Sequence, residues 1–510
     1  MMKKTLTFHI EEKAETLQEG TFKVPSGCLT LTFVHDLDEA FAFLVFLLIR
    51  DPQGNLRLQK QLAHGEPVIS LGQNGMDTTI GGVPGSLPEG EWTVQVCLFA
   101  EHLDRIMDGK KVCFSVTVSD EKAKITEQIG PHVWTRGSFA YEKYEYDRLY
   151  KKACRWYKGD FHTHTRLSDG KETTWNATKK AEKDELDYYV PTEHNVVHTG
   201  WQDTDVMILP GVEMTTILGH ANLFGLTGRP EGLTSILSDK EPEKLEMDIE
   251  AMIQECREKG WLFSVNHPFL YIWKWLYGDL KLADMNCLEI INDPTYAADE
   301  KAHAEEANQK AVYLSDLLWA DGYRICAVGG SDSHNLLEER YGDAMEPSVP
   351  GDPATYVYMD GMSPEHLLNA LKACHVYVTR HCSVENVLEA DGRPVLFGDQ
   401  LPYRTGEIRY EFRFLGLSEE PDVFFIENGE RHSCSSVMEK DGIYRVKGTI
   451  KLSRCDYTWI RFGAETKDGQ FLFYANPVTT GCKTEHKFIT FEEVKTCLEG
   501  CWKDDQRNSF

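Results

Sequence analysis

The sequence has no apolar run that could cross a bilayer. The longest run, residues 40–49, is about half of the roughly 20 residues that a membrane-spanning helix needs, and Arg50 follows it. We therefore predict a buried strand here and no membrane association. The pattern of a signal peptide is also missing, because Glu11, Glu12 and Glu15 interrupt the apolar segment that such a peptide requires. We expect a cytoplasmic protein.

Paired cysteines are absent too. The 14 cysteines of the 510-residue chain contain no Cys-x-x-Cys pair and no repeated spacing, which argues against a zinc ribbon and against a disulfide framework. We predict reduced thiols, as in the cytoplasm. Internal repeats and low-complexity segments are likewise missing. A composition of 41% hydrophobic and 26% charged residues is typical of a folded protein rather than a disordered one.

Positive charge is scarce in the sequence. Lys and Arg number 54 against 81 Asp and Glu, which gives a formal net charge of −27. Because such a surface repels polyanions, we expect no extended nucleic-acid partner. A small anionic substrate is compatible with this charge, since a metal ion or an arginine can make a pocket locally positive. The oligomeric state is left open.

The hydrophobic pattern divides the chain into four segments. Residues 1–135 carry strand patterns separated by Gly, Pro and Asn turns, which predicts an N-terminal β-sandwich-like domain. Residues 136–385 alternate short apolar strands with amphipathic stretches, which is the pattern of an α/β domain. Strand alternation returns over 386–485 and predicts a C-terminal β-sandwich-like domain. We interpret residues 486–510 as a polar tail.

Three helices are predicted within the α/β segment. Apolar residues recur at helical spacing over residues 243–259 and 301–320. A third helix is expected to begin at Ser363-Pro-Glu-His366, because Ser is a capping residue and Pro suits the first helical position.

Side chains that can bind metals recur at the ends of the apolar strands in residues 136–385. They are His162, His164, Asp169, His194, Glu213, His220, His267, Asp332 and His334. A single His after a strand is more often a core or turn residue, and about one His-x-His pair is expected by chance among 18 His. Nine such residues at the strand ends of one barrel would meet at one mouth, where burying them without partners is costly. Divalent metal ions are the simplest way to satisfy them.

The same residues fall into short motifs with a fixed order. These are His162-Thr-His164, Ser168-Asp-Gly170, Thr192-Glu-His194, Gly211-Val-Glu213, Asn266-His-Pro268 and Gly330-Ser-Asp-Ser-His334. Their order and spacing resemble those of the PHP (polymerase and histidinol phosphatase) superfamily of metal-dependent phosphoesterases. The segments Pro210-Gly-Val-Glu-Met-Thr-Thr216 and Gly219-His-Ala-Asn222 are similar to its CehA/McbA branch, whose members also carry β domains. The resemblance covers about residues 155–385, under half of the chain.

This resemblance implies a distorted seven-stranded (β/α) barrel that holds two or three divalent ions, for which Zn, Mn and Fe are equally suitable. Glu213 would bridge the first ion and the second. The ligands implied for the three ions are, in order, His162, His164, Glu213 and Asp332; Glu213, His220 and His267; and Asp169, His194 and His334. The sequence departs from the family at Arg166, where a small residue is usual, and at Glu193, where Asp is commoner. Both departures indicate altered contacts around the metals rather than their loss.

The chemistry expected of such a site is hydrolysis, because two ions about 3.5–4 Å apart can activate water and neutralise charge on a phosphoryl or carbonyl group. The side chains implied in catalysis are Glu213, Asp332, His267 and Arg380. Candidate substrate contacts are Arg166, Arg380 and Tyr271, the last from the aromatic segment 268–277. Asn195 and Asn266 stand next to ligands and are candidates to orient them.

Three functions are compatible with these features. The best supported is a phosphoesterase that hydrolyses a small phosphate ester at a di- or trinuclear metal site. The first alternative is hydrolysis of a carbamate, ester or amide at the same site, which the CehA/McbA resemblance leaves open. The second alternative is a non-catalytic protein that binds metal, carbohydrate or another protein. The presence of all nine ligand-type residues argues against this last function.

Overall fold

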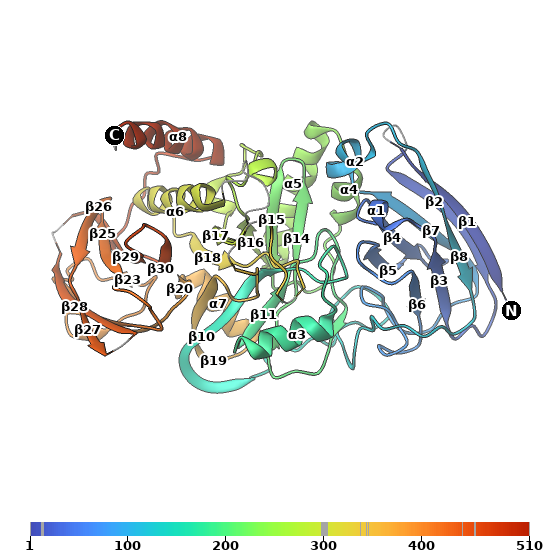
Figure 1. Cartoon of the computed structure of the whole chain (residues 1–510), viewed down its shortest axis with the longest axis horizontal. Helices are drawn as coiled ribbons and strands as arrows, with labels where there is room; N and C mark the ends of the chain where they lie inside the picture. The colour runs from blue at the N-terminus through green and yellow to red at the C-terminus, as the bar shows by residue number, and fades with distance from the viewer. Residues whose placement is uncertain are drawn as a thin grey trace.

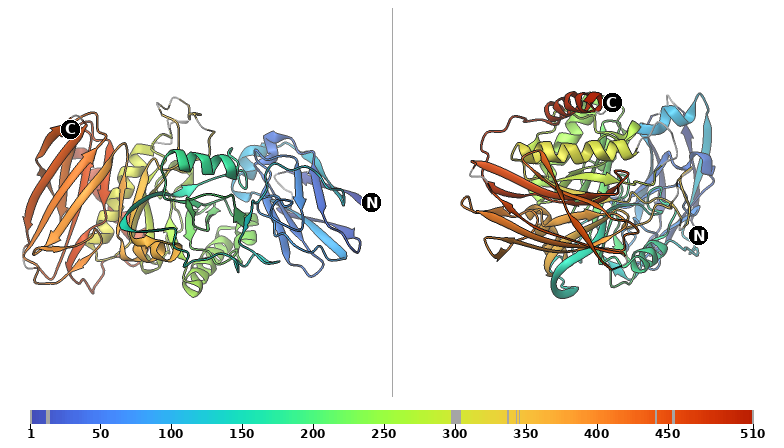
Figure 2. Two further views of the ribbon diagram at one scale, coloured as in Figure 1. Left: turned by 90° about the horizontal axis from the view of Figure 1, so that it is seen from below. Right: turned by 60° about the vertical axis from the view of Figure 1, so that its left-hand side comes forward.

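The computed structural model describes residues 2–11, 15–296, 304–336, 338–342, 344, 346–440, 442–452 and 455–508. The molecule is a mixed α/β protein with several sheets. Figure 1 and Figure 2 show its N-terminal strands at one end, the α/β elements in the middle and the C-terminal strands at the other end. Among the described residues, no helix has the length and apolar character of a membrane span.

The N-terminal strands form two antiparallel four-stranded sheets. The first has the order β1 (Lys3–Ile10), β8 (Val112–Ser119), β3 (Leu31–His35) and β6 (Val68–Leu71). The second has the order β2 (Leu17–Val24), β7 (Gly90–Leu98), β4 (Val45–Arg50) and β5 (Leu56–Gln61). Their facing side chains form one hydrophobic core, to which β1 contributes every second residue, Leu6, Phe8 and Ile10. Two short helices, α1 (Glu39–Ala42) and α2 (Ala100–Met107), accompany the second sheet.

Strand β4 is apolar and buried from residue 45 to residue 49 because both of its faces are covered. Val45 and Leu47 point into the core between the two sheets. Phe46 and Leu48 point the other way and pack in a second cluster with Leu167, which belongs to the central part of the chain. The buried strand predicted over residues 40–49 is present only from Val45 onward, because residues 40–42 belong to α1. Its second face attaches the N-terminal strands to the α/β region.

A central sheet continues into the C-terminal part of the chain. Its hydrogen-bonded order is β13 (Met207–Ile208), β11 (Tyr188–Pro191), β10 (Lys151–Thr163), β19 (Ala354–Met362), β20 (Val376–Thr379), β30 (Phe471–Ala475), β29 (Tyr457–Glu465), β25 (Asp422–Glu427) and β26 (Glu430–Cys434). β31 (Val478–Gly481) pairs with β29, and β23 (Gln400–Leu401) pairs with β31. Because β20 pairs with β30, the sheet crosses the boundary predicted at residue 385.

A second central sheet carries Glu213 and His220 on its strands. Its order is β14 (Gly211–Thr216), β15 (Gly219–Phe224), β16 (Leu262–Val265), β17 (Cys287–Asn292) and β18 (Cys326–Gly330). β16, β17 and β18 run parallel to one another, whereas β15 is antiparallel to both of its neighbours. A short pair, β9 (His132–Val133) with β12 (Gly200–Trp201), lies outside both central sheets.

The seven-stranded barrel expected from the family resemblance is not confirmed. The strand ladders divide the central strands between two sheets, and the isolated bridges Thr163↔Ser333 and His194↔Glu213 connect these sheets. The ladders are interrupted at both places because the residues after β10, β11 and β18 leave the strands. These are the segments that carry His164, His194 and Asp332.

The longer helices cover the central sheets. They are α3 (Thr174–Lys183), α4 (Leu233–Ser238), α5 (Pro242–Lys259), α6 (Ala304–Ala320) and α7 (Pro364–Ala373), with 3-10 turns at Tyr271–Trp273 and Leu282–Asp284. The predicted cap of α7 is present, since the Ser363 side chain accepts a hydrogen bond from the His366 N–H and Pro364 begins the helix. Helix α6 matches the prediction over 301–320 from residue 304 onward. Residues 301–303 lie outside the described part of the chain.

The C-terminal strands pack as a two-layer structure. The second layer has the order β22 (Arg393–Pro394), β21 (Ser383–Ala390), β24 (Glu407–Leu415), β28 (Ile443–Lys451) and β27 (Ser436–Lys440). Phe412 and Phe414 of this layer share a core with Phe462 and Phe473 of the long sheet. The segment predicted as a polar tail instead contains helix α8 (Phe491–Asn508), which contacts α6. The prediction was wrong because α8 buries an apolar face despite its polar composition.

Candidate metal centre

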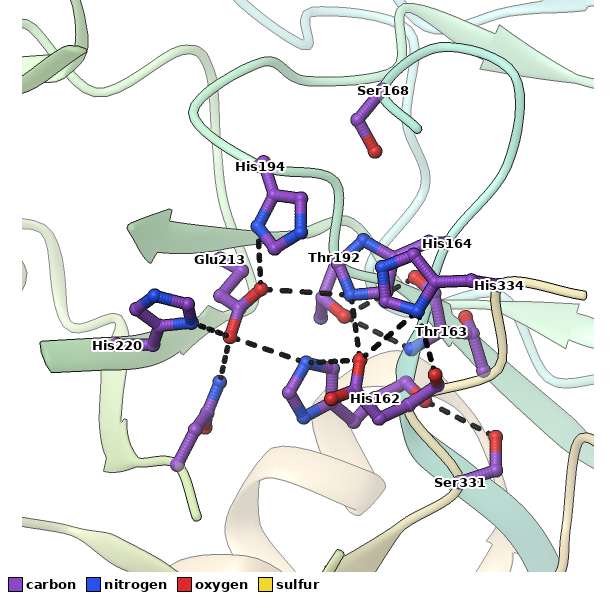
Figure 3. A network of polar contacts seen from close by, with 12 residues as sticks. His162, Thr163, His164, Ser168, Thr192, His194, Glu213, His220, Ser331 and His334 are labelled. Carbon is purple, nitrogen blue, oxygen red and sulfur yellow. Dashed lines mark hydrogen bonds and ion pairs between the residues drawn. The ribbon is translucent and has the colours of Figure 1, made fainter. Parts of the chain in front are cut away.

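The structure brings all nine ligand-type residues into one continuous network of polar contacts, part of which is drawn in Figure 3. His162 lies in β10, Glu213 in β14 and His220 in β15. The others follow strands or lie in the loops between them. They are His164, Asp169, His194, His267, Asp332 and His334. The strand ends converge on one buried place, as the sequence pattern predicts.

The carboxylate of Glu213 lies at the middle of this network. Its Oε1 is 3.3 Å from His162 Nε2, 3.2 Å from His220 Nδ1 and 3.4 Å from His267 Nε2. Its Oε2 is 2.8 Å from His194 Nδ1 and 3.5 Å from Nε2 of His164. Glu213 is fully buried, so one carboxylate interacts with several imidazoles out of contact with bulk water.

Two aspartates hold the other side of the network. Asp332 Oδ1 lies 3.3 Å from His162 Nε2 and 3.1 Å from His164 Nε2. Asp169 Oδ1 lies 3.5 Å from His194 Nε2 and 3.3 Å from His334 Nε2. The imidazoles of His164 and His334 are stacked, with ring centroids 4.0 Å apart. Protonating both stacked rings would place two positive charges face to face.

The electrostatics of the cluster favour charged carboxylates and, at His164, a free imidazole lone pair. At His162, His194 and His334 burial lowers the pKa, but the neighbouring carboxylates outweigh it and raise the pKa above its usual value. Burial by itself would raise the pKa of Glu213, but the neighbouring His162, His194 and His220 outweigh it and hold the pKa well below its usual range. For His164, burial and the nearby His334 lower the pKa to about 4. An imidazole that is neutral at neutral pH is the form that binds a metal ion.

Several buried atoms in the cluster have no hydrogen-bond partner among the described residues. They include Nε2 of His162, both ring nitrogens of His164, Oδ1 of Asp169, Oε2 of Glu213 and Oδ1 of Asp332. Buried polar atoms are ordinarily satisfied, and leaving this many unsatisfied in one place would be costly. Mixed imidazole and carboxylate donors suit divalent transition metals, so the residues present fit metal ions.

The spacing of donor atoms defines four overlapping groups that could each hold an ion. They are His164, Asp169, His194 and His334; His162, His164 and Asp332; His194, Glu213 and His220; and His162, His267 and Glu289. The grouping differs in detail from the implied assignment, because His164 joins the predicted third set and His194 joins Glu213. Some residues belong to two groups because donor atoms from several strands point into one small volume. Which residues bind which ion therefore stays a prediction.

Sequence reasoning missed Glu289, which lies in the middle of β17. It is buried, and its Oε1 accepts a hydrogen bond from Nδ1 of His162 at 2.9 Å while its Oε2 accepts from the His267 N–H at 2.8 Å. Because Nδ1 of His162 is engaged, Nε2 is the nitrogen left to face an ion. Gly330 leaves room for this contact, since a Cβ there would lie 2.5 Å from the Glu289 carboxylate. A lone carboxylate within an apolar strand was the signal that could have revealed it.

We predict that Glu289→Gln lowers metal affinity by about 10- to 100-fold, because the variant removes the charge that orients His162 and makes it more basic. The dissociation constant can be measured by competition with a chromophoric chelator. Glu430→Gln, on the exposed part of β26, is the matched control and should bind metal as the wild type does. An unchanged dissociation constant in Glu289→Gln would rule out an orienting role.

The two asparagines predicted to orient ligands have different contacts. Asn266 Nδ2 donates to Glu213 Oε1 at 2.9 Å, so it touches the central carboxylate itself. Asn195 instead exchanges two hydrogen bonds with the backbone of Thr215, at 3.0 and 2.8 Å, and has a left-handed backbone with φ of 54°. Thr215 in turn lies 2.6 Å from the His194 ring. Asn195 therefore holds β14 against the loop that carries His194.

Glu193, which replaces the commoner aspartate, points away from the metal ligands. Its carboxylate accepts hydrogen bonds from Thr165, from Ser168 and from the ring of His198. Burial would raise its pKa, but the hydrogen bond and charge of His198 lower it to about 2. The longer side chain thus joins the loop around Asp169 to the loop around His194.

The predicted substrate contacts do not meet at the ligands. Arg380 pairs with Asp352 at 3.1 Å and with Glu346 at 2.9 Å, and it lines a different cavity. We therefore no longer assign Arg380 to the catalytic residues, because Asp352 and Glu346 already bind its guanidinium group. Arg166 donates to the backbone of Lys171 at 2.8 Å, away from the ligands. Tyr271 is in contact with the ring of Trp273, which does line the site.

A cavity of about 360 Å³ opens next to the ligands. Six of the nine ligand-type residues reach its wall, namely Asp169, His194, His220, His267, Asp332 and His334. Trp273, Tyr296 and Tyr341 supply aromatic surface from the loops around them. The volume is that of a site for a small molecule. Fold and site together define a protein with a buried cluster suited to several metal ions, beside a small-molecule cavity.

Comparison with known proteins gives only distant similarities. No family model and no curated protein matches the chain. Among solved structures, a two-domain protein from Bacteroides vulgatus, described as containing a predicted PHP-like metal-dependent phosphoesterase, is 15% identical. That match covers 66% of this chain and 99% of the other, with a TM-score of 0.32. A Bifidobacterium adolescentis protein, provisionally described as a metal-dependent phosphoesterase, is 14% identical, with 37% and 92% coverage and a TM-score of 0.25. At these TM-scores neither similarity assigns a function.

Proposed function

We propose that this protein is a metal-dependent hydrolase of the PHP type, most specifically a phosphoesterase that acts on a small phosphate ester. One observation carries the proposal: the buried carboxylate of Glu213 lies within 3.5 Å of five imidazoles, several of whose atoms have no other partner. The cavity beside this cluster limits the substrate to a small molecule. We also propose that the protein is cytoplasmic and that its chain is organised into an N-terminal, a central and a C-terminal unit.

The residues that would hold two or three ions are the nine of the network, with Glu213 as the bridge. When bound, divalent ions would lower the pKa of a coordinated water and offset charge on the phosphoryl oxygens. The chain's own residues position this site. Asn266 holds the bridging carboxylate, and Glu289 fixes the ring of His162. Trp273 and Tyr341 line the cavity and would contact a bound substrate.

Activity measurements with added Zn, Mn or Fe test the proposal directly. Phosphomonoesters, phosphodiesters, carboxyl esters, carbamates and amides should be compared at equal concentration with the same enzyme preparation. We expect kcat/KM to be highest for a phosphate ester. Faster hydrolysis of a carbamate or carboxyl ester would assign the second reaction class to the site, and no turnover with any metal would contradict an enzymatic role.

We predict that a small phosphate ester is hydrolysed far better than long nucleic acid. The net charge of −27 repels a polyanion, whereas the positive field of bound ions extends only about 8 Å at physiological salt. A mononucleotide-sized ester fits within that radius. The measurement is kcat/KM for a phosphodiester monomer and for a long single strand at matched salt. A preference for the polymer would overturn this expectation.

A further inference from the structure

Part of the wall of the metal-site cavity comes from the N-terminal sandwich, far in sequence from the ligands. Phe43 ends α1, His64 follows β5, and His102 and Arg105 lie on α2. All four line the same cavity of about 360 Å³ as the metal ligands. A substrate bound at the ligands would therefore also contact the N-terminal strands and helices.

This wall is held firmly against the loops that carry the ligands. The backbone N–H of Gln61 donates to the Leu167 carbonyl at 3.0 Å, beside Asp169. The Gln59 side chain donates to the Val197 carbonyl at 3.0 Å. The ring of Phe99, just before α2, lies 6.4 Å from the imidazole of His194. In Figure 1, α2 lies beside α4, which it also contacts. The position of α2 relative to the ligands is thus set by packing on both sides.

The wall presents donors for an anion. Nη2 of Arg105 lies 3.0 Å from Nδ1 of His102. A guanidinium can only donate, so Nδ1 accepts and the remaining ring proton is on Nε2. The rings of Phe43 and Phe99, with centroids 5.2 and 5.0 Å from that of His102, fix the imidazole. A planar guanidinium suits a carboxylate or a phosphate, which it can bind through two N–H groups.

Arg105 differs from the other candidate arginines because it lines the cavity beside the metal ligands. Arg166 and Arg380, which the sequence suggested as anion contacts, lie away from this cavity with their guanidinium groups already bonded. Among the described residues that line the cavity, Arg105 is the one arginine. Lys171 also lines it, but its ammonium group pairs with Glu339. Arg105 is exposed and lines the cavity.

We propose that Arg105, supported by His102, binds a second anionic group of the substrate, on the part of the molecule that the metal site does not hold. The proposal rests on the proposed function, because the metal side would take the phosphate that is cleaved. It narrows the substrate class to small phosphate esters that carry a further carboxylate or phosphate. It also gives the N-terminal sandwich a direct part in choosing the substrate.

Binding of phosphonates, which no phosphoesterase cleaves, tests the subsite without turnover. Calorimetry on the full-length, metal-reconstituted protein should compare alkylphosphonates with ω-phosphonocarboxylates of one to four methylenes. We expect at least one phosphonocarboxylate to bind about tenfold more tightly than the alkylphosphonate of equal length, as for a charge-assisted hydrogen bond. Alkane bisphosphonates of the same lengths show whether the second group is a phosphate rather than a carboxylate.

Variants then assign the preference to Arg105. Arg105→Gln should reduce the tenfold preference to near one and leave alkylphosphonate binding unchanged, and Arg105→Lys should retain part of it. Lys23→Gln, an exposed charge change on β2 away from the cavity, should keep it. A wild type without any preference, or a preference that Arg105→Gln does not alter, would overturn the subsite.

The outcome also separates this subsite from the proposed function. A wild type that hydrolyses simple phosphate esters but shows no phosphonocarboxylate preference would overturn the subsite alone. A wild type that shows the Arg105-dependent preference but hydrolyses no phosphate ester would overturn the proposed function and keep the subsite.

Discussion

Glu213→Gln is expected to lower kcat/KM by about a thousandfold or more and to reduce the amount of bound metal. The variant keeps the size of the side chain but removes the negative charge that five imidazoles share. Losing the carboxylate that we propose as the bridge would remove several kcal/mol of stabilisation from a metal-assisted transition state, and each 1.4 kcal/mol corresponds to about a factor of ten. Steady-state kinetics and elemental analysis of the same sample measure both effects.

The control for this substitution is Glu430→Gln on β26, which changes the net charge by the same amount far from the site. It should retain wild-type kinetics and metal content. Circular dichroism should show that the strands of both variants remain folded, so that any loss is local. Wild-type turnover and metal content in Glu213→Gln would contradict the bridging role.

Metal removal is expected to destabilise the protein strongly. The buried imidazole and carboxylate atoms that have no hydrogen-bond partner would regain partners when ions bind. Ions that bind only the folded state, at about a thousand times their dissociation constant, stabilise it by about 4 kcal/mol. Differential scanning calorimetry with and without a chelator should show the loss, and elemental analysis of the reconstituted protein should give two to three ions per chain.

Reconstitution provides the control for the chelation experiment. Adding Zn, Mn or Fe back should restore both the melting temperature and the ion content, whereas Glu213→Gln should show a smaller change in each. Fewer than one ion per chain after reconstitution would contradict a multinuclear site. An unchanged melting temperature on complete metal removal would show that the cluster is satisfied without ions.

Local sequence patterns were sufficient for much of the fold. The alternation in β1, the continuous apolar run of β4 and the Ser363-Pro364 start of α7 each follow from how residues at fixed spacing face a core or a cap. The positions of the ligands were also readable, because His162, Glu213 and the other ligand-type residues stand at or near the ends of successive strands. In the structure these positions lie in two sheets, whose strand ends come together at the cluster.

Long-range packing decided what these patterns leave open. No local signal says that Glu289 of β17 reaches His162 in the other central sheet, or that α8 buries an apolar face against α6. A strand pattern also does not state its partners, so the division of the central strands into two sheets was not predictable from the resemblance.

The chemistry that the site can perform was determined by the sequence, through the kinds of residue at its strand ends. Its surroundings were decided only by the tertiary structure. An arginine binds whichever anion the fold brings to it, so Arg380 is taken up by Asp352 and Glu346 while Arg105 on α2 reaches the cavity. The reason is physical: ligand type is a property of each side chain, whereas proximity between residues distant in sequence is a property of how the elements pack.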